Sequence, residues 1–184
     1  MAKPIWYVLG LLILWMLQFV VAVRKPKSTP VKTAPKARWG IVLQALGYWA
    51  IFLPARTLWV EPIPLWRLGA GIALGLAGIW LASAGVRHLG KQWRVEAGLN
   101  EDHVLVTSGP YQMVRHPIYA SMVAMYGMSA LMLGRLPWWP IGVVLFLAGI
   151  EIRVHVEDAL LWERFGSRFQ EWKKQVPAYL PLLR

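Results

Sequence analysis

The feature of this 184-residue chain that most constrains its fold is a series of five long stretches without Asp, Glu, Lys or Arg. A helix needs about 20 apolar residues to cross a bilayer core, with roughly 17–25 as the usual range. The fifth stretch is short and reaches that length by continuing into the charged segment after it. The pattern predicts about five transmembrane helices, at Pro4–Val23, Trp39–Ala55, Leu68–Val86, His116–Gly134 and from Leu136–Ile150 onward.

The composition supports a single membrane domain. The chain is 57% hydrophobic and only 16% charged, and the apolar residues occur in blocks. Because the helices use up most of the chain, no separate soluble domain has room. We therefore expect residues 1–184 to form one all-α integral membrane domain. Residues 1–86 would hold three helices, and residues 87–184 the other two together with the functional region.

The distribution of charge predicts the orientation. A net charge of +11 would suit nucleic acid, but the basic residues concentrate in the loops after the first and third stretches and in the tail, as cytoplasmic segments do. This predicts a prokaryotic plasma membrane protein with its N-terminus outside and its C-terminus inside, and no nucleic-acid partner. The basic, acid-free segment 24–38 reads as a flexible linker against anionic headgroups, serving topology or, alternatively, partner binding.

Metal and thiol chemistry are not expected. The chain has no cysteine, which excludes disulfides, thiolate ligands and a cysteine nucleophile. Its four histidines, His88, His103, His116 and His155, follow no recognised ligand spacing. We predict no metal site.

Two further patterns concern packing. The third stretch carries small residues on one helical face, which favours close approach of another helix, in the same chain or in a second one. They are Gly71, Gly75, Gly78, Ala82 and Gly85. Near the C-terminus, an apolar stripe predicts one amphipathic helix ended by Pro177. It consists of Leu161, Phe165, Phe169, Trp172 and Val176.

The first candidate for chemistry is Arg115-His116-Pro117. Proline is favoured in the first turn of a helix, so Pro117 is predicted to begin the fourth helix. Arg115 and His116 would then lie beside free amide groups at the positive end of the helix dipole, which suits an anion. Anchoring of the helix at the membrane interface would explain the same residues.

The second candidate is a polar cluster at the end of the fifth helix, formed by Glu151, Arg153, His155, Glu157 and Asp158. Ionisable residues this close to the hydrocarbon are costly unless they face the interior, so a functional site is the default hypothesis. An i,i+4 salt bridge between Arg153 and Glu157 is the alternative. The cluster holds more acid than one arginine needs, which favours a pocket that binds both a cation and an anion.

These residues carry a resemblance. HVLVTSGPYQMVRHPIYAS, then R-x-x-x-E-D, LLWERFG and a terminal VPAYLPLL resemble the isoprenylcysteine carboxyl methyltransferase family, over roughly Gly90 to Leu183. The wider group includes phospholipid N-methyltransferases and, more distantly, membrane sterol reductases. Where the family usually has two glutamates, this chain has Glu157-Asp158.

The resemblance implies S-adenosylmethionine in a cytoplasm-facing cavity, with a lipophilic or lipid-modified acceptor entering from the bilayer. Carried over by position, the family's cofactor contacts fall on His103, Val104, Leu105, Val106, Tyr111, His116, Pro117, Ile118, Tyr119 and Glu157. The family's substrate-positioning arginine falls on Arg153. Arg153 and Glu157 are thus the expected catalytic pair. A further cofactor position of the family falls near Glu96.

The chemistry of these side chains fits those roles. Glu157 can pair with the cofactor's ammonium group, and His116 with its carboxylate. The run Val104–Val106 reads as a short β-like segment whose edge can hydrogen-bond the adenine. Tyr111 or Tyr119 can face the sulfonium cation. A hydroxyl or amine acceptor would need a base, for which His155 and Asp158 are candidates.

The predicted function is therefore S-adenosylmethionine-dependent methyl transfer to a lipophilic acceptor, most like carboxyl O-methylation. Three alternatives remain at this point: a phospholipid N-methyltransferase, an NADPH-dependent membrane reductase and a non-catalytic scaffold. Glu157 would oppose the phosphates of NADPH, and charges kept at membrane depth without use are costly. The acceptor and the oligomeric state stay open.

Overall fold

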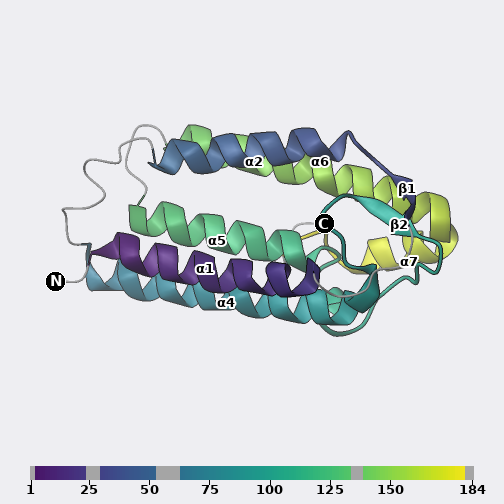
Figure 1. Cartoon of the computed structure of the whole chain (residues 1–184), viewed down its shortest axis with the longest axis horizontal. Coiled ribbons are helices and arrows are strands. Elements are labelled where there is room, and N and C mark those ends of the chain that lie inside the picture. The colour runs from purple at the N-terminus through teal and green to yellow at the C-terminus, as the bar shows by residue number, and fades with distance from the viewer. Residues whose placement is uncertain (1–2, 24–29, 53–62, 134–138, 181–184) are drawn as a thin grey trace.

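Five long helices run along a common axis in the computed structural model, which describes residues 3–23, 30–52, 63–133 and 139–180 (Figure 1). They are α1 Pro4–Val23, α2 Ala37–Phe52, α4 Leu65–Leu89, α5 Pro117–Leu133 and α6 Trp139–Phe165. Each apolar stretch forms one of these helices, although positions 53–55 and 134–138 lie outside the described residues. As predicted, α6 continues from its apolar part through the charged segment.

The helices are those of a membrane protein. Among the described residues, α1, α4 with the turn after it, and α6 are long and apolar enough to cross a membrane, and α5 is a shorter apolar helix. The chain is therefore an all-α membrane protein, as predicted. The number of spans and their orientation stay predictions.

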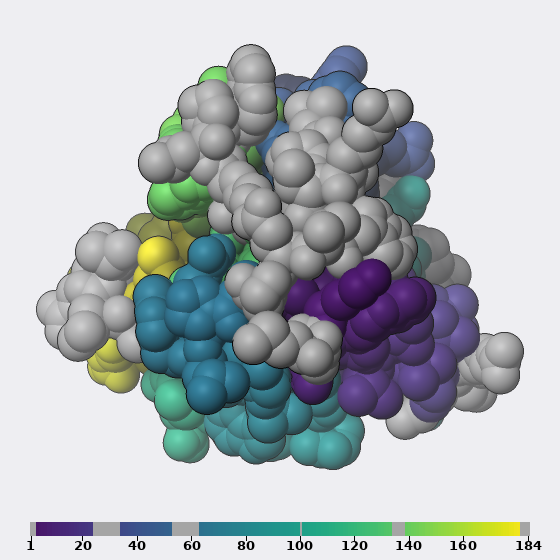
Figure 2. Space-filling view, turned by 90° about the vertical axis from the view of Figure 1, so that its left-hand side faces the viewer, coloured from purple at the N-terminus to yellow at the C-terminus, as the bar shows by residue number. Residues whose placement is uncertain are grey.

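The helices form two layers, with α1, α4 and α5 in one and α2 and α6 in the other (Figure 1). Helix α4 packs along α5 and α1, and α2 packs along α6. Figure 2, seen from the end where α1 and α4 begin, shows these two helices side by side. The N- and C-terminal ends of consecutive helices alternate, so α1, α4 and α6 all end where α2 and α5 begin.

The small-residue face of α4 packs inside the chain. A Cβ atom on Gly71 would lie 2.4 Å from Cε of Met132 on α5, and one on Gly78 would lie 3.0 Å from Sδ of Met125. The methionine side chains of α5 therefore occupy the space that larger residues on α4 would fill. The packing interpretation of this face is confirmed, and its partner is a helix of the same chain.

The contact between α2 and α6 is closer still. A Cβ on Gly40 would lie 2.5 Å from the carbonyl oxygen of Gly149, and a Cβ on Gly149 would lie 2.5 Å from the carbonyl oxygen of Gly40. Gly47 and Gly142 repeat this arrangement further along the same helices, with Gly142 O 2.7 Å from a Cβ on Gly47. Backbone thus meets backbone at two levels, an arrangement that the sequence analysis did not predict.

A small sheet at one end of the bundle corrects two predictions. Strand β1 (Pro30–Thr33) pairs antiparallel with β2 (Gly98–Asn100). The flexible-linker prediction for segment 24–38 is wrong at residues 30–33, which are a paired strand, while 24–29 lie outside the described residues. Val104–Val106 is not a strand. The Val104 amide instead donates a hydrogen bond to Oε1 of Gln92, 2.8 Å away.

The C-terminal helix also differs from its prediction. Helix α6 ends at Phe165, Gly166 adopts a positive φ of 53°, and α7 (Ser167–Gln175) begins after it. The apolar stripe is therefore divided between two helices, with Val176 just after the second, because a glycine in the left-handed region turns the chain between them. Phe169 is the buried residue of α7. Short 3₁₀ turns at Gly90–Gln92 and Gly109–Gln112 complete this end of the molecule.

Candidate active site

A cavity of about 390 Å³ lies where α1 and α4 end and α5 begins. This is within the usual size range of small-molecule sites. All the residues that the sequence analysis assigned to the cofactor or the substrate line it. They are His103, Val104, Leu105, Val106, Tyr111, His116, Pro117, Ile118, Tyr119, Arg153 and Glu157. The structure thus brings residues 103–119 and residues 153–157 together in one cavity, and Glu96 lines the same cavity.

Pro117 begins α5, as predicted. The amide groups before it are not free, however. The N–H of Arg115 donates to the carbonyl of Pro177, and the N–H of His116 donates to that of Ala178, both at 2.8 Å. The C-terminal VPAY segment therefore occupies the donors that the sequence analysis left for an anion. This correction arises because the tail folds back along the start of α5.

The His116 side chain is held between two carboxylates. Its Nε2–H donates to Oδ1 of Asp158 at 2.8 Å, and its Nδ1 lies 3.5 Å from Oε2 of Glu157. A ring whose two nitrogens both face acceptors is best satisfied as an imidazolium. Burial alone would lower the pKa of His116, but the hydrogen bonds and charges of Asp158 and Glu157 outweigh it and raise that pKa. Both the geometry and the direction of this shift favour the protonated, positively charged form of His116.

Asp158 joins three elements at this end of the bundle. Besides the ring of His116, it accepts hydrogen bonds from Nη2 of Arg115 at 3.1 Å and from Nζ of Lys173 at 2.9 Å. Its side chain is only 8% exposed and is not among the residues lining the cavity. These contacts make it a structural link between α6, the start of α5 and α7, and they leave it poorly placed for the base role considered from sequence. The other base candidate, His155, is exposed and outside the cavity.

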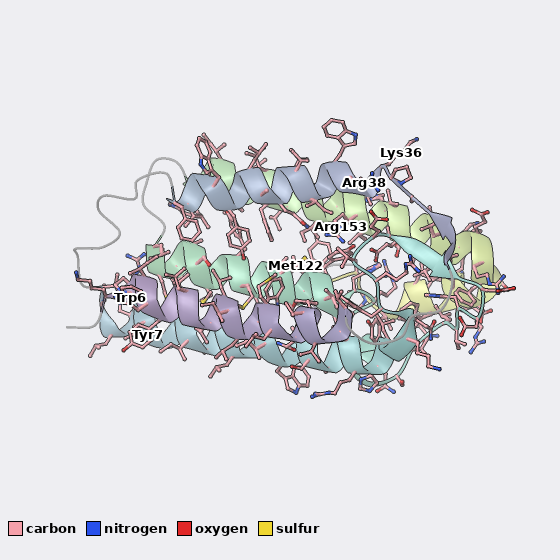
Figure 3. All side chains as sticks on the ribbon, in the orientation of Figure 1. Trp6, Tyr7, Lys36, Arg38, Met122 and Arg153 are labelled. Carbon is pink, nitrogen blue, oxygen red and sulfur yellow. The ribbon has the colours of Figure 1, made fainter. Side chains whose placement is uncertain are left out.

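Arg153, Tyr119 and Glu157 meet inside the cavity. The Tyr119 hydroxyl donates to Oε1 of Glu157. The Arg153 guanidinium lies over the Tyr119 ring, with Cζ 4.9 Å from the ring centroid, and Nη2 donates to the carbonyl of Val95 at 3.1 Å. Figure 3 shows Arg153 directed from α6 toward the opposite layer, where Met122 lies.

The salt-bridge alternative for Arg153 is not what forms. Among the described residues, Arg153 and Glu157 make no ion pair with each other, because Tyr119 and His116 take the Glu157 carboxylate. Nε of Arg153 is buried and has no hydrogen-bond partner among the residues that the structure describes. Arg153 thus contributes a positive charge to the cavity, and none of the acidic side chains that the structure describes forms an ion pair with it.

Comparison with known proteins identifies the family. The family model described as phospholipid methyltransferase matches residues 66–168, which is more than half of the chain and includes α5, the loop before it and all of α6. The chain belongs to the phospholipid methyltransferase family.

Three proteins from other organisms are similar to this chain. Protein-S-isoprenylcysteine O-methyltransferases of Rattus norvegicus and Schizosaccharomyces pombe are 28% and 29% identical over 97% and 58% of this chain. A cobalt-zinc-cadmium resistance protein of Cupriavidus metallidurans is 29% identical over 68% of the chain. The chain spans 65%, 46% and 52% of these relatives, respectively. Among the residues that the structure describes, no His, Asp and Glu side chains group to hold a metal ion.

In the candidate active-site cavity, His103 and Tyr111 carry uncharged polar groups. Burial, together with the charge of Arg164, lowers the pKa of His103, and its Nδ1 has no partner in the described residues. Burial and the charge of Glu157 raise the pKa of Tyr111, so its hydroxyl stays protonated. That hydroxyl lies 3.4 Å from the Gly85 carbonyl, which it donates to. The cavity therefore offers neutral donors as well as several basic side chains, Arg153 among them, and the carboxylates of Glu96 and Glu157.

The sequence analysis missed one wall of the cavity, which α1 provides. Trp15, Met16, Phe19, Val20 and Val23 line it. Trp15 donates from Nε1 to Oγ of Ser121 at 3.1 Å, and Phe19 stacks on Trp93 with ring centroids 5.6 Å apart. Met16, Val20 and Val23 are each about half exposed. In the sequence these residues have the apolar character of any lipid-facing helix. Only Trp15, with its polar indole N–H, could have indicated that this face of α1 lines a site.

Proposed function

We propose that this chain is an S-adenosylmethionine-dependent methyltransferase acting on a lipophilic acceptor at the membrane–cytoplasm interface. One observation carries the proposal: the residues that resemble a methyltransferase cofactor site line one cavity, and apolar side chains of α1 line the same cavity. A polar donor and a lipophilic acceptor need such a mixed site. Family membership supports the transfer of a methyl group.

The residues fit a zwitterionic donor. Glu157 is one of two carboxylates that line the cavity, with Glu96, and its side chain is 29% exposed, so it can receive an ammonium group while Tyr119 and His116 hold its carboxylate in place. Unpartnered Nδ1 of His103 and the backbone of Val104–Val106 can hydrogen-bond a purine. The imidazolium of His116 adds positive charge nearby. S-adenosylmethionine, when bound, supplies an electrophilic methyl group on a sulfonium, and Tyr111 and Tyr119 supply aromatic faces for that cation.

Arg153 suits an acidic acceptor. Its guanidinium is buried, stacked on Tyr119 and free of close acidic partners among the described residues, and a guanidinium binds a carboxylate in a fixed, bidentate geometry. An acceptor carboxylate is already a nucleophile, so Arg153 needs only to orient it in line with the methyl group. This favours carboxyl O-methylation over phospholipid N-methylation, in which a cationic amine would meet the same arginine.

The cavity end of the bundle is the expected cytoplasmic end. Segment 24–38, with its basic residues, connects α1 to α2 at this end, where Figure 3 labels Lys36 and Arg38. Under the positive-inside rule, we propose five spans, with the N-terminus outside and the cavity facing the cytoplasm of a prokaryotic plasma membrane.

Calorimetric titration of the detergent-purified protein tests the donor site. S-adenosylmethionine and its demethylated product should each bind saturably, NADPH should not, and Glu157→Gln should abolish binding in a protein that still folds. Glu101→Gln, which changes an exposed carboxylate outside the cavity, is the matched control. Binding of NADPH alone would move the assignment to a reductase. A folded protein that binds none of the three would refute the enzyme and leave a scaffold.

Arg153→Ala separates donor from acceptor binding. We expect this variant to bind S-adenosylmethionine within about twofold of the wild-type Kd and to lose at least about 100-fold in turnover, because a desolvated charge contact is typically worth 2–5 kcal/mol. Arg153→Lys should recover only part of the rate, since an ammonium lacks the bidentate geometry. Equal losses of donor binding and of turnover in Arg153→Ala would contradict this assignment.

A further inference from the structure

A second cavity, of about 430 Å³, lies on the outer side of the same end of the molecule. Its lining is mostly polar and comes from the segment before α5 and from α7, with Thr107, Gln112, Arg168 and Glu171 among its residues. Leu105 and Trp172 line both this outer cavity and the candidate active site. These two side chains therefore form the boundary between the two spaces.

Trp172 has an unused hydrogen-bond donor. Its indole Nε1 is buried and has no acceptor among the residues that the structure describes. A buried indole N–H usually has a partner, because leaving it unpaired costs about 1–3 kcal/mol. Trp15, which also lines the active-site cavity, follows that rule by donating to Ser121. The difference points to an acceptor for Trp172 on a molecule bound in the cavity.

The helix that carries Trp172 is fixed at both ends. Gly166 turns the chain into α7 with φ 53°, and Phe169 buries its side chain beneath the helix. At the other end, Lys173 pairs with Asp158, and Arg115 donates to the carbonyls of Lys173 and Val176. Asp158 and Arg115 are the residues that also hold His116 and the start of α5. Trp172 is therefore positioned by the same contacts that build the active site.

We propose that Trp172 closes the water-side entrance of the active-site cavity and donates its Nε1–H to the polar methyl donor bound there. The inference rests on the proposed function. A lipophilic acceptor can reach the cavity past the half-exposed side chains of α1, but a charged, water-soluble donor needs a polar route. The outer cavity provides that route, and the indole of Trp172 with Leu105 separates it from the reacting groups. Closing the entrance also keeps water from the donor.

Binding kinetics of methyl-labelled S-adenosylmethionine test this role, with association and dissociation rates measured by rapid filtration of protein in detergent. Trp172→Phe keeps an aromatic ring but removes the N–H, and should raise Kd about fivefold, the usual worth of one hydrogen bond. Trp172→Ala also removes the barrier, and should speed both association and dissociation at least about tenfold. Trp162→Phe and Trp162→Ala, which change an exposed tryptophan of α6 outside both cavities, are the matched controls.

A variant in the outer cavity makes the test independent of any unfolding in Trp172→Ala. Thr107→Trp adds bulk to the outer cavity alone, and should slow both rates without changing Kd. If the wild-type protein binds the donor but both rates and Kd of the Trp172 variants stay within twofold of wild type, the role of Trp172 is refuted while the methyltransferase stands. If the wild-type protein binds no donor, the proposed function itself fails. Unchanged rates in Thr107→Trp would refute the polar entrance.

Discussion

The interior of the helix bundle and its site end are held together by different forces. In the interior, glycines bring helices into contact, backbone against backbone between α2 and α6 and against methionine side chains between α4 and α5. At the site end, buried charges join the elements, with Asp158 contacting Arg115, His116 and Lys173. In the interior, the close packing at these glycines leaves no space for an added Cβ atom. At the site end, stability depends on the pairing of buried charges, so the loss of any one partner leaves another charge uncompensated.

This contrast separates two adjacent acids that look equivalent in sequence. Glu157 faces the cavity and is partly exposed, whereas Asp158 is buried behind His116. We therefore propose that Glu157 binds the ligand and that Asp158 holds the neighbouring elements together. The family's usual pair of glutamates would carry a longer side chain at the second position, and the shorter aspartate of this chain still reaches three cations.

The largest expected effect on stability comes from Asp158→Asn. Removing one partner from a buried ion pair costs about 3–5 kcal/mol, because the remaining charges lose their compensation. We expect the free energy of unfolding in detergent to fall by about 3 kcal/mol, whereas Glu157→Gln changes it by less than about 1 kcal/mol. Thermal or denaturant unfolding followed by circular dichroism gives both values. Equal destabilisation by the two variants would remove the distinction between these acids.

A smaller loss of stability is expected from Gly149→Ala in the bundle interior. The new Cβ would lie 2.5 Å from the Gly40 carbonyl oxygen, and backbone cannot rotate away as a side chain can. Overpacking of this kind costs about 1–3 kcal/mol. Gly69→Ala is the control, since nothing lies within 4 Å of its added Cβ, and alanine in a helix is favoured over glycine by about 0.5–1 kcal/mol. The account of the interior fails if both substitutions stabilise the protein.

The smallest expected effect is a dependence of stability on pH. The pKa of His116 is raised in the folded protein, so the folded state binds a proton more tightly than the unfolded state does. The stabilisation is complete below the ordinary histidine pKa and is lost as pH rises through the raised value. The unfolding midpoint of the wild-type protein should therefore fall toward alkaline pH more steeply than that of His116→Gln. Parallel profiles would show that His116 is not the buried cation described here.

The fold was largely predictable from the sequence because each of the five long helices contains a long run without charges. The bounds of α1 match the first stretch, Pro117 begins α5, and α6 extends into its charged segment. The pairing of β1 with β2 was not predictable, since a Pro-, Lys- and Thr-rich segment pairs with a strand far along the chain. The helix break at Gly166 was not predicted, because the apolar stripe continues at helical spacing on both sides of this glycine.

The composition of the site was predicted through family resemblance, and its internal connections were not. The assigned residues do line one cavity. The partners of His116 and Arg115 depend instead on how α7 and the C-terminal segment fold back, which no local pattern encodes. The wall provided by α1 was missed for a related reason: an apolar side chain facing lipid and one facing a ligand have the same sequence signature.

The most direct test of the central claim is methyl transfer itself. Purified protein in lipid vesicles would be incubated with methyl-labelled S-adenosylmethionine and a panel of prenylated and fatty carboxylic acids, and the label would be counted in the organic phase. The account predicts label in a base-labile ester with wild-type protein, and none with Glu157→Gln or Arg153→Ala. Label in an amine-containing phospholipid would instead mark N-methylation. A folded wild-type protein that binds no S-adenosylmethionine and transfers no label would contradict the account.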